Sequence, residues 1–342
     1  MKFMPSQSRS EESDAERYPG WFGSFLADRA IVKPSPHTAK AYRQDFEAIA
    51  VLLCGGGARV TDLRPSDLTK DALHDAFGAY AGTHSAASIR RCWSTWNMVC
   101  TFLYTNEMLS ANPMPLIGRP KVPKSLPKSL GVDTVSELIS AIDNDRGSVR
   151  RSDWAERDRA LVFTALLTGL RADELIKANV GDIRITNDGA VIAVHGKGNK
   201  DRHIPVGPEL VNVLTDYLES RQHRFPSVKR RGQTAGPTAW PATAPLFVGS
   251  NGERITRGTL QYRVLRAFRK AGLNSQRARG VLVHGLRHTF ATELANENIS
   301  VYTLMKLLSH ESMVTSQRYV DGAATETRAA AAQNPLYRLL QQ

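Results

Sequence analysis

A proline-rich basic segment separates two stretches of this chain that have helical apolar patterning. The segment is PMPLIGRPKVPKSLPKSLG, residues 113–131, and five of its positions are proline. Proline fixes φ and removes a backbone donor, so this segment is predicted to be an extended linker. With 342 residues, the chain has room for two domains of ordinary size. We expect a flexible tail at 1–17, a helical domain at 18–112, the linker at 113–131 and a second domain at 132–342.

The first domain is predicted to contain four helices, because apolar residues recur at helical spacing from Tyr18 to Met108. Residues that favour helix N-termini indicate where three of them start: Thr38 for the second, Ser66-Asp67 for the third and Ser85 for the fourth. Three consecutive glycines at 55–57 are expected to end the second helix.

The second domain has a different pattern, with short apolar runs that predict strands. Helices are expected near 133–143, 152–167 and 172–179, followed by strands at 183–185, 191–194 and 203–206. Turn residues at 187–189 and 196–201 favour a small antiparallel sheet, and later segments are mostly helical. The Pro/Gly/Arg-rich stretch 223–244 is predicted to form a long surface loop. The fold class is therefore mainly α with a small antiparallel β-sheet.

The charge balance favours a polyanionic partner. Lys and Arg exceed Asp and Glu by 45 to 33, a net charge of +12 with a pI near 9.8. Nucleic acid is the leading partner class. Charge alone also fits a basic protein that merely avoids self-association, so the motifs must decide between these interpretations.

The cysteines and the apolar segments exclude several other classes. Cys54, Cys92 and Cys100 are the three cysteines, without C-x-x-C spacing, and they indicate neither a disulfide framework nor a zinc site. The sequence contains no signal peptide and no apolar run of membrane-spanning length, so a cytoplasmic protein without a membrane partner is expected.

Four segments of the second domain carry candidate chemistry: TGLRADEL (168–175), HGKGNKDRHIPV (195–206), HGLRHTFATEL (284–294) and LLSHESMVTSQRY (307–319). Cleaving a phosphodiester without a metal ion requires a nucleophile, cations on the non-bridging oxygens and an acid for the leaving alkoxide. Arg171 and Arg287 are candidates for the cations, because two guanidinium forks can bind both phosphate oxygens. His284 precedes Arg287 by one helical turn, so both can face one phosphate.

Together and in this order, the four segments resemble the tyrosine recombinases, also called the phage integrase family, and most closely its Xer-like branch. The resemblance extends from about Tyr18 to the C-terminus and omits the N-terminal tail and the 223–244 loop. It implies a SAM-like helical core-binding domain, a catalytic domain and no cofactor. It also implies cleavage and rejoining of DNA through a 3′-phosphotyrosine and a Holliday junction, by a tetramer on two synapsed sites.

The resemblance also implies roles for individual residues. Lys197, at the tip of the predicted hairpin, is the general acid, with Lys200 as a less favoured competitor. Tyr319, nine residues after His310, is the nucleophile. The remaining site residues are Arg171 and Arg287 on the phosphate, His284 in proton handling, His310 as a phosphate hydrogen-bond donor, and Glu174 as an orienting carboxylate. His288 is predicted to be a structural residue, and Tyr262, Tyr302 and Tyr337 are predicted to be half-buried packing residues.

Three positions beside the site depart from the usual family residues. Ser309 stands where glycine is common, Gly285 where aspartate or threonine is frequent, and Asp173 where the Xer branch often has serine. These departures concern the subfamily more than the chemistry.

Double-stranded DNA with an inverted-repeat core site is the expected partner, with accessory or partner recombinase proteins possible. The expected DNA contacts in the first domain are Thr38, Lys40, Arg43, Ser88, Arg90 and Arg91. The C-terminal segment 335–340 is expected to dock into a neighbouring subunit or to pack on its own domain. About seventeen residues precede the first predicted helix, too few for the separate arm-binding domain of larger phage integrases, so a simple recombinase is expected. Association with the nucleoid is also expected. Two other functions stay open: a type IB topoisomerase that relaxes DNA as a monomer, and a non-catalytic DNA-binding regulator.

Overall fold

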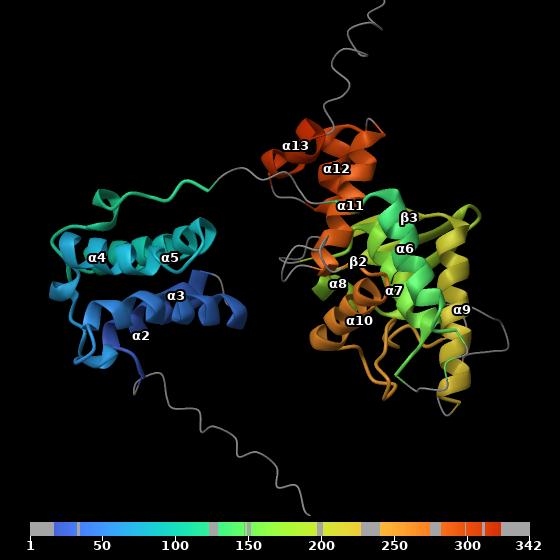
Figure 1. Cartoon of the computed structure of the whole chain (residues 1–342), viewed down its shortest axis with the longest axis horizontal. Helices are drawn as coiled ribbons and strands as arrows, with labels where there is room; N and C mark the ends of the chain where they lie inside the picture. Colours follow the sequence, from blue (N-terminus) through green and yellow to red (C-terminus); the bar gives the residue numbers. More distant parts are fainter. Residues whose placement is uncertain are drawn as a thin grey trace, which may run out of the picture. The chain divides into compact units, whose positions relative to one another are not determined.

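The structure is a computed structural model that divides the chain into two compact units, Met1–Lys124 and Ser125–Gln342. The division falls inside the predicted linker (Figure 1). The described residues are 17–32, 35–122, 129–146, 148, 152–196, 201–226, 240–273, 282–297, 299–309 and 312–322. Residues 1–16 of the predicted tail, part of the linker and the segment 335–340 lie outside them.

The first unit is a helical domain built around aromatic side chains. Its helices are α2 (Gly20–Val32), α3 (Pro36–Cys54), α4 (Lys70–Ala81) and α5 (Ala86–Thr105), and α3 packs against the other three (Figure 1). The Phe46 ring lies between those of Phe22 and Trp96, with centroid distances of 3.8 and 5.1 Å. Burying these large rings supplies much of the hydrophobic stabilisation of a small domain.

The helix boundaries follow local capping, which corrects two predicted starts. Ser85 caps α5 and Gly55 ends α3 in the left-handed region, both as predicted. However, α3 begins at Pro36 rather than after Thr38, because proline suits the first helical turn. Ser66-Asp67 lies in a 3₁₀ turn, η2 (Pro65–Asp67), in which the Asp67 carboxylate accepts from the Arg64 backbone N–H. The third helix, α4, starts after Thr69 instead.

The second unit combines helices with one three-stranded sheet, which confirms the predicted fold class. Strands β1 (Ile183–Thr186), β2 (Gly189–Val194) and β3 (Arg202–Val206) pair antiparallel in that order. The helices are α6 (Val132–Asp143), α7 (Ala155–Thr168), α8 (Ala172–Lys177), α9 (Pro208–Arg224), α10 (Arg257–Lys270), α11 (Leu282–Asn296), α12 (Val301–Leu308) and α13 (Met313–Gly322). No helix in the described part of the chain is long and apolar enough to cross a membrane.

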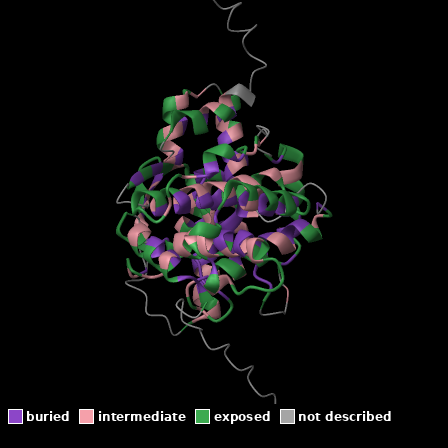
Figure 2. Ribbon diagram, turned by 90° about the vertical axis from the view of Figure 1, so that its left-hand side faces the viewer, coloured by how far each residue is buried: buried purple, intermediate pink, exposed green. Residues whose placement is uncertain are grey.

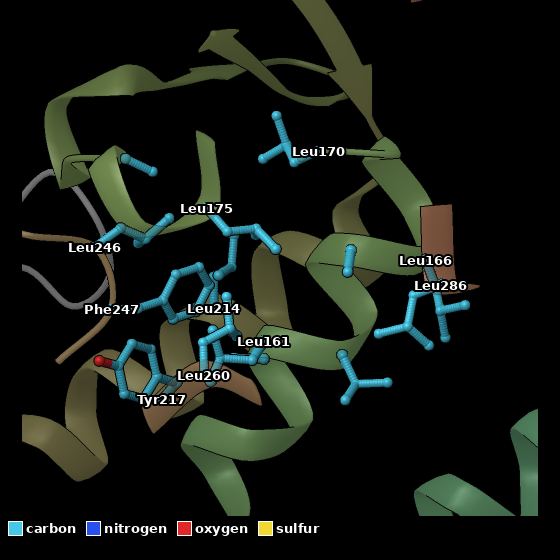
Figure 3. Packing of buried hydrophobic residues seen from close by; sticks show 14 of the residues in the cluster. Leu161, Leu166, Leu170, Leu175, Leu214, Tyr217, Leu246, Phe247, Leu260 and Leu286 are labelled. Carbon is cyan, nitrogen blue, oxygen red and sulfur yellow. The ribbon is translucent and has the colours of Figure 1, made fainter. Parts of the chain in front are cut away.

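Helix α7 lies at the centre of this unit, in contact with α6, α9 and α11. Ten of its fourteen residues are buried, including polar ones. Figure 3 shows the cluster around it, where Tyr217 stacks on Phe247 at a centroid distance of 5.7 Å. Figure 2 shows buried and exposed stretches interleaved along the helices, as expected where each helix buries one face. Such a rigid centre gives the neighbouring helix ends fixed positions.

The predicted surface loop at 223–244 is anchored at both described ends, which corrects part of that prediction. Helix α9 continues to Arg224, and Trp240 is buried beneath the Arg221 guanidinium. The carbonyls of Ala242 and Ala244 accept hydrogen bonds from the backbone of η4 (Val180–Asp182). A buried tryptophan and strand-like backbone pairing hold these ends in the core. The residues between them, 227–239, lie outside the described residues.

Candidate active site

The turn after α7 brings the first predicted arginine into position. Gly169 ends α7 with φ of 61°, and a Cβ there would lie 2.4 Å from the Phe290 ring. Both the conformation and the close packing require glycine. Two residues later, Arg171 precedes α8. Its backbone N–H donates to Glu174 Oε2 at 2.7 Å and its Nη1 to Oε1 at 2.9 Å. One carboxylate therefore orients both the backbone and the side chain of Arg171.

Glu174 is also paired with a second arginine that sequence reasoning missed. Arg202, the first residue of β3, donates through Nη1 and Nη2 to both carboxylate oxygens at 3.0 and 2.8 Å, and both side chains are buried. Burial alone raises the pKa of Glu174, but the hydrogen bonds and charge of Arg202, with those of Arg171, lower it to about 2. The available signal was strand alternation, which places Arg202 on the same buried face as Ile204.

Replacing Glu174 with glutamine is expected to lower the free energy of unfolding by about 3–5 kcal/mol at pH 7, because Arg202 would remain buried without its counter-ion. The pKa of Glu174 in the folded protein is lowered from 4.5 to about 2. The stability that the Glu174 carboxylate contributes is therefore present above pH 4.5 and is lost as the pH falls toward 2. Urea denaturation should therefore show that the difference in free energy of unfolding between Glu174→Gln and the wild type becomes smaller from pH 4.5 to pH 2.

The matched control for this prediction is the neighbouring carboxylate. Asp173→Asn removes an exposed ion pair with Arg257, and such pairs contribute less than about 1 kcal/mol. Equal losses of stability in the two variants would contradict the structural role of Glu174.

The second predicted arginine, Arg287, lies on α11 and is 1% exposed. Its Nη1 donates to the Gly169 carbonyl and its Nη2 to the Leu308 carbonyl at 2.6 Å. Burial and the nearby charge of Arg171 lower the pKa of Arg287 to about 10, so it stays protonated at neutral pH. A buried guanidinium held by two carbonyls is a fixed positive charge.

The two arginines converge on the end of α12. Arg171 Nη2 donates to the Ser309 carbonyl at 3.1 Å, next to the Leu308 carbonyl that accepts from Arg287. Ser309 has φ of 48°, in the left-handed region that favours glycine. Consecutive carbonyls at a helix C-terminus thus hold two cations that come from different helices.

The predicted nucleophile lies near Arg287. Tyr319, on α13, is 5% exposed and packs among Phe290, Leu304 and Leu308. Its hydroxyl lies 2.6 Å from His288 Nδ1. Burial raises the pKa of Tyr319, and the charge of Arg287 acts against that rise. An attacking phenol must lose its proton, and a nearby guanidinium assists that loss.

Two histidines lie one turn apart on α11. The His284 ring is 4.2 Å from that of His288, edge to face. Desolvation lowers the pKa of His284, as do the charges of Arg287 and Arg171. His288 is more strongly affected, with its pKa lowered to about 4. Both rings are therefore neutral at pH 7.

The structure brings together Arg171, Glu174, His284, Arg287 and Tyr319. Lys197, its competitor Lys200 and His310 lie outside the described residues. The prediction that Tyr262 and Tyr302 pack half-buried is wrong, since they are 55% and 54% exposed; Tyr337 also lies outside the described residues.

In the first unit, the predicted DNA contacts lie on α3 and α5. Lys40 is exposed on α3, Thr38 and Arg43 are partly buried there, and Ser88 and Arg90 are partly buried in the first turns of α5. Arg91 has a further role that sequence reasoning missed. Its guanidinium binds the buried Asp45 carboxylate at 2.6 Å, so it balances a buried charge while 59% of its side chain stays exposed.

Comparison with known sequences assigns the chain to a family. Residues 128–326 match the phage integrase family. The chain is 31% identical to tyrosine recombinase XerC of Alcanivorax borkumensis over 313 residues, 90% of this chain and 91% of that protein. It is 30% identical to tyrosine recombinase XerD of Ralstonia nicotianae over 299 residues, 87% and 88% of the two chains.

Solved structures with the same fold agree. The XerH site-specific recombinase bound to palindromic difH aligns with a TM-score of 0.66 and 19% identity, covering 86% of this chain and 79% of that one. A lambda integrase (75–356) dimer bound to a COC′ core site aligns with a TM-score of 0.62 and 18% identity, covering 90% and 96%. The chain belongs to the phage integrase family. It is a tyrosine site-specific recombinase, which confirms the resemblance seen in the motifs.

Proposed function

We propose that this recombinase cleaves DNA by attack of Tyr319 Oη on phosphorus, which leaves a 3′-phosphotyrosine and a free 5′-hydroxyl. The P–O5′ bond breaks as the Tyr–P bond forms, and the phenol proton is lost while the 5′-oxygen gains one. The bond energy is retained in the phosphotyrosine, so rejoining needs no nucleotide or other cofactor. The observation that carries the proposal is that Arg171 and Arg287 donate to consecutive carbonyls at the end of α12, where Leu308 shares an apolar cluster with Tyr319.

In this proposal each remaining residue has one task. Arg171 and Arg287 bind the non-bridging oxygens and stabilise the charge that develops on them. Lys197 is the general acid for the 5′-oxygen, His284 handles protons, and His310 donates a hydrogen bond to the phosphate. Glu174 orients Arg171 and does not touch the DNA.

The proposed assembly is a homotetramer on two synapsed sites that exchanges strands through a Holliday junction. One solved structure with this fold is a lambda integrase tetramer bound to a Holliday junction, with a TM-score of 0.61 and 18% identity. The segment 335–340 would dock into a neighbouring subunit and close the ring. The substrate would be double-stranded DNA with an inverted-repeat core site in the nucleoid, with accessory or partner recombinase proteins where the reaction requires them.

The first unit is proposed to bind the flanking DNA through α3 and α5. Replacing the exposed Lys40 with alanine should weaken binding uniformly across sequences and reduce the slope of log K against log salt by about 1, the loss of one phosphate contact. Fluorescence anisotropy over a salt series measures this slope. Arg17→Ala is the control, because Glu47 already neutralises Arg17 and its removal should leave the slope unchanged. An unchanged slope for Lys40→Ala would exclude Lys40 as a phosphate contact.

Covalent trapping tests the proposed function directly. The purified protein is incubated with sheared genomic DNA of its host and denatured with SDS, and the protein-linked DNA ends are sequenced. Adducts concentrated at a few inverted-repeat sites are expected. Dispersed adducts would indicate a type IB topoisomerase. Tight DNA binding without adducts would indicate a non-catalytic regulator.

A further inference from the structure

His288 has no task in the proposed chemistry, yet it touches the proposed nucleophile. It lies on α11 directly after Arg287, and its Nδ1 is 2.6 Å from Tyr319 Oη, within the range of a strong hydrogen bond. The two ring centroids are 5.7 Å apart. The two residues lie on different helices and are 31 positions apart in the chain, so the contact is not a consequence of local sequence.

Apolar packing holds the Tyr319 ring, whereas the position of its hydroxyl depends on polar contacts. The Tyr319 ring is held in an apolar cluster by Phe290, Leu304 and Leu308, which restricts both side-chain torsions. A buried hydroxyl without a partner would cost about 1–3 kcal/mol. His288 supplies a partner in either tautomer: an unprotonated Nδ1 accepts from the phenol, and a protonated Nδ1 donates to Oη. In both cases the imidazole fixes the place of the oxygen.

The protonation states support a neutral hydrogen bond. Burial raises the pKa of Tyr319, and burial with the charges of His284 and Arg287 lowers the pKa of His288 to about 4. A neutral imidazole adds no cation beside Arg287 and leaves the phenol protonated until DNA arrives. The contact therefore restrains the oxygen without ionising it.

We propose that His288 is the positioning residue for the nucleophile: its Nδ1 holds Tyr319 Oη in line for attack on the phosphate bound by Arg171 and Arg287. The proposal rests on the proposed function. It replaces the earlier interpretation of His288 as a purely structural histidine, since its partner is the reacting oxygen. Misplacement of a reacting atom by about 1 Å can cost about a hundredfold in rate.

Two substitutions at one position test the hydrogen bond. The amide of asparagine places a polar atom close to the position of Nδ1, whereas leucine fills similar space without one. On a nicked duplex carrying the site recovered by trapping, His288→Leu is expected to slow single-turnover cleavage by about 10- to 100-fold. His288→Asn should restore most of the rate. Melting temperatures and DNA affinities of both variants serve as controls for folding and binding.

A second substrate distinguishes a defect in positioning the nucleophile from a defect in protonating the leaving group. Sulfur in place of the bridging 5′-oxygen leaves as a thiolate, which needs no acid because its conjugate thiol has a pKa near 8.5. This substrate should relieve the defect of Lys197→Ala and leave that of His288→Leu unchanged.

Two results would overturn the positioning role of His288 alone, and a third would overturn the proposed function with it. Cleavage by His288→Leu at the wild-type rate, or faster, would overturn the positioning role while the proposed function stands. Relief of His288→Leu by the sulfur substrate would also overturn it, because the defect would then lie in protonation of the leaving group. Absence of adducts with the wild-type protein would overturn the proposed function and this inference together.

Discussion

Replacing Tyr319 with phenylalanine is expected to abolish covalent attachment to DNA, a loss of at least about 10⁴-fold in rate, as removal of an enzyme nucleophile typically causes. The ring packs in an apolar cluster, so phenylalanine preserves the shape and removes only the reacting oxygen. DNA affinity should change by less than about twofold, because no phosphate contact is assigned to this residue. SDS gels of trapped complexes measure the first quantity and fluorescence anisotropy the second.

Two exposed tyrosines provide controls for this substitution. Tyr262→Phe and Tyr302→Phe alter phenols that are 55% and 54% exposed, and both variants should form adducts at the wild-type rate. Adducts that persist in Tyr319→Phe and disappear in one of these variants would assign the nucleophile elsewhere.

Replacing Arg171 with alanine is expected to reduce cleavage about 10³-fold, since arginines that stabilise phosphoryl charge contribute about 10³–10⁵ in rate. Arg171→Lys should recover only a small part of the loss, because an ammonium keeps the charge and lacks the planar fork that Glu174 orients. Single-turnover cleavage under saturating protein separates this effect from binding.

The matched control for Arg171 is an arginine on the neighbouring helix. Arg257 pairs with the exposed Asp173 in the same region and is itself exposed, and Arg257→Ala should cleave at nearly the wild-type rate. Equal losses in the two variants would show that general positive charge, rather than a positioned guanidinium, drives the reaction.

The parts of the fold set by local patterns could be predicted from the sequence. Ser85 and Gly55 mark helix ends because a cap needs only its own neighbouring backbone. The same logic misplaced the third helix of the first domain. Ser66-Asp67 has the composition of a cap, but the Asp67 carboxylate closes a 3₁₀ turn onto Arg64, and Thr69 caps α4 three residues later.

The charged interactions of the interior could not be predicted in the same way. Arg202 and Glu174 are 28 positions apart, and Arg91 and Asp45 are 46 apart. A charged residue is normally solvated, so sequence alone favours the surface for all four. The burial of Arg202, Glu174 and Asp45 depends on pairing between elements that meet only in the folded chain, whereas the Arg91 side chain is 59% exposed.

In the candidate site, too, the contact between distant segments could not be predicted from the sequence. The ordered motifs predict Arg171, Arg287 and Tyr319 as site residues from the sequence. They do not connect His288 to Tyr319, because the contact forms only when α13 packs on α11. The half-buried packing predicted for Tyr262 and Tyr302 is wrong because it rests on the average behaviour of tyrosine, which does not determine how exposed a particular position on a helix is.

The most direct test of the central claim is to identify the residue that carries the DNA. Trapped adducts are digested with nuclease and trypsin, and the peptides are analysed by mass spectrometry. Cleavage after Arg318 and Arg328 gives the peptide YVDGAATETR, and we predict a nucleotide mass on its tyrosine, Tyr319, in the wild type and none in Tyr319→Phe. A nucleotide on any other residue, or adduct formation without a modified peptide from 319–328, would contradict the assignment of Tyr319 as the nucleophile.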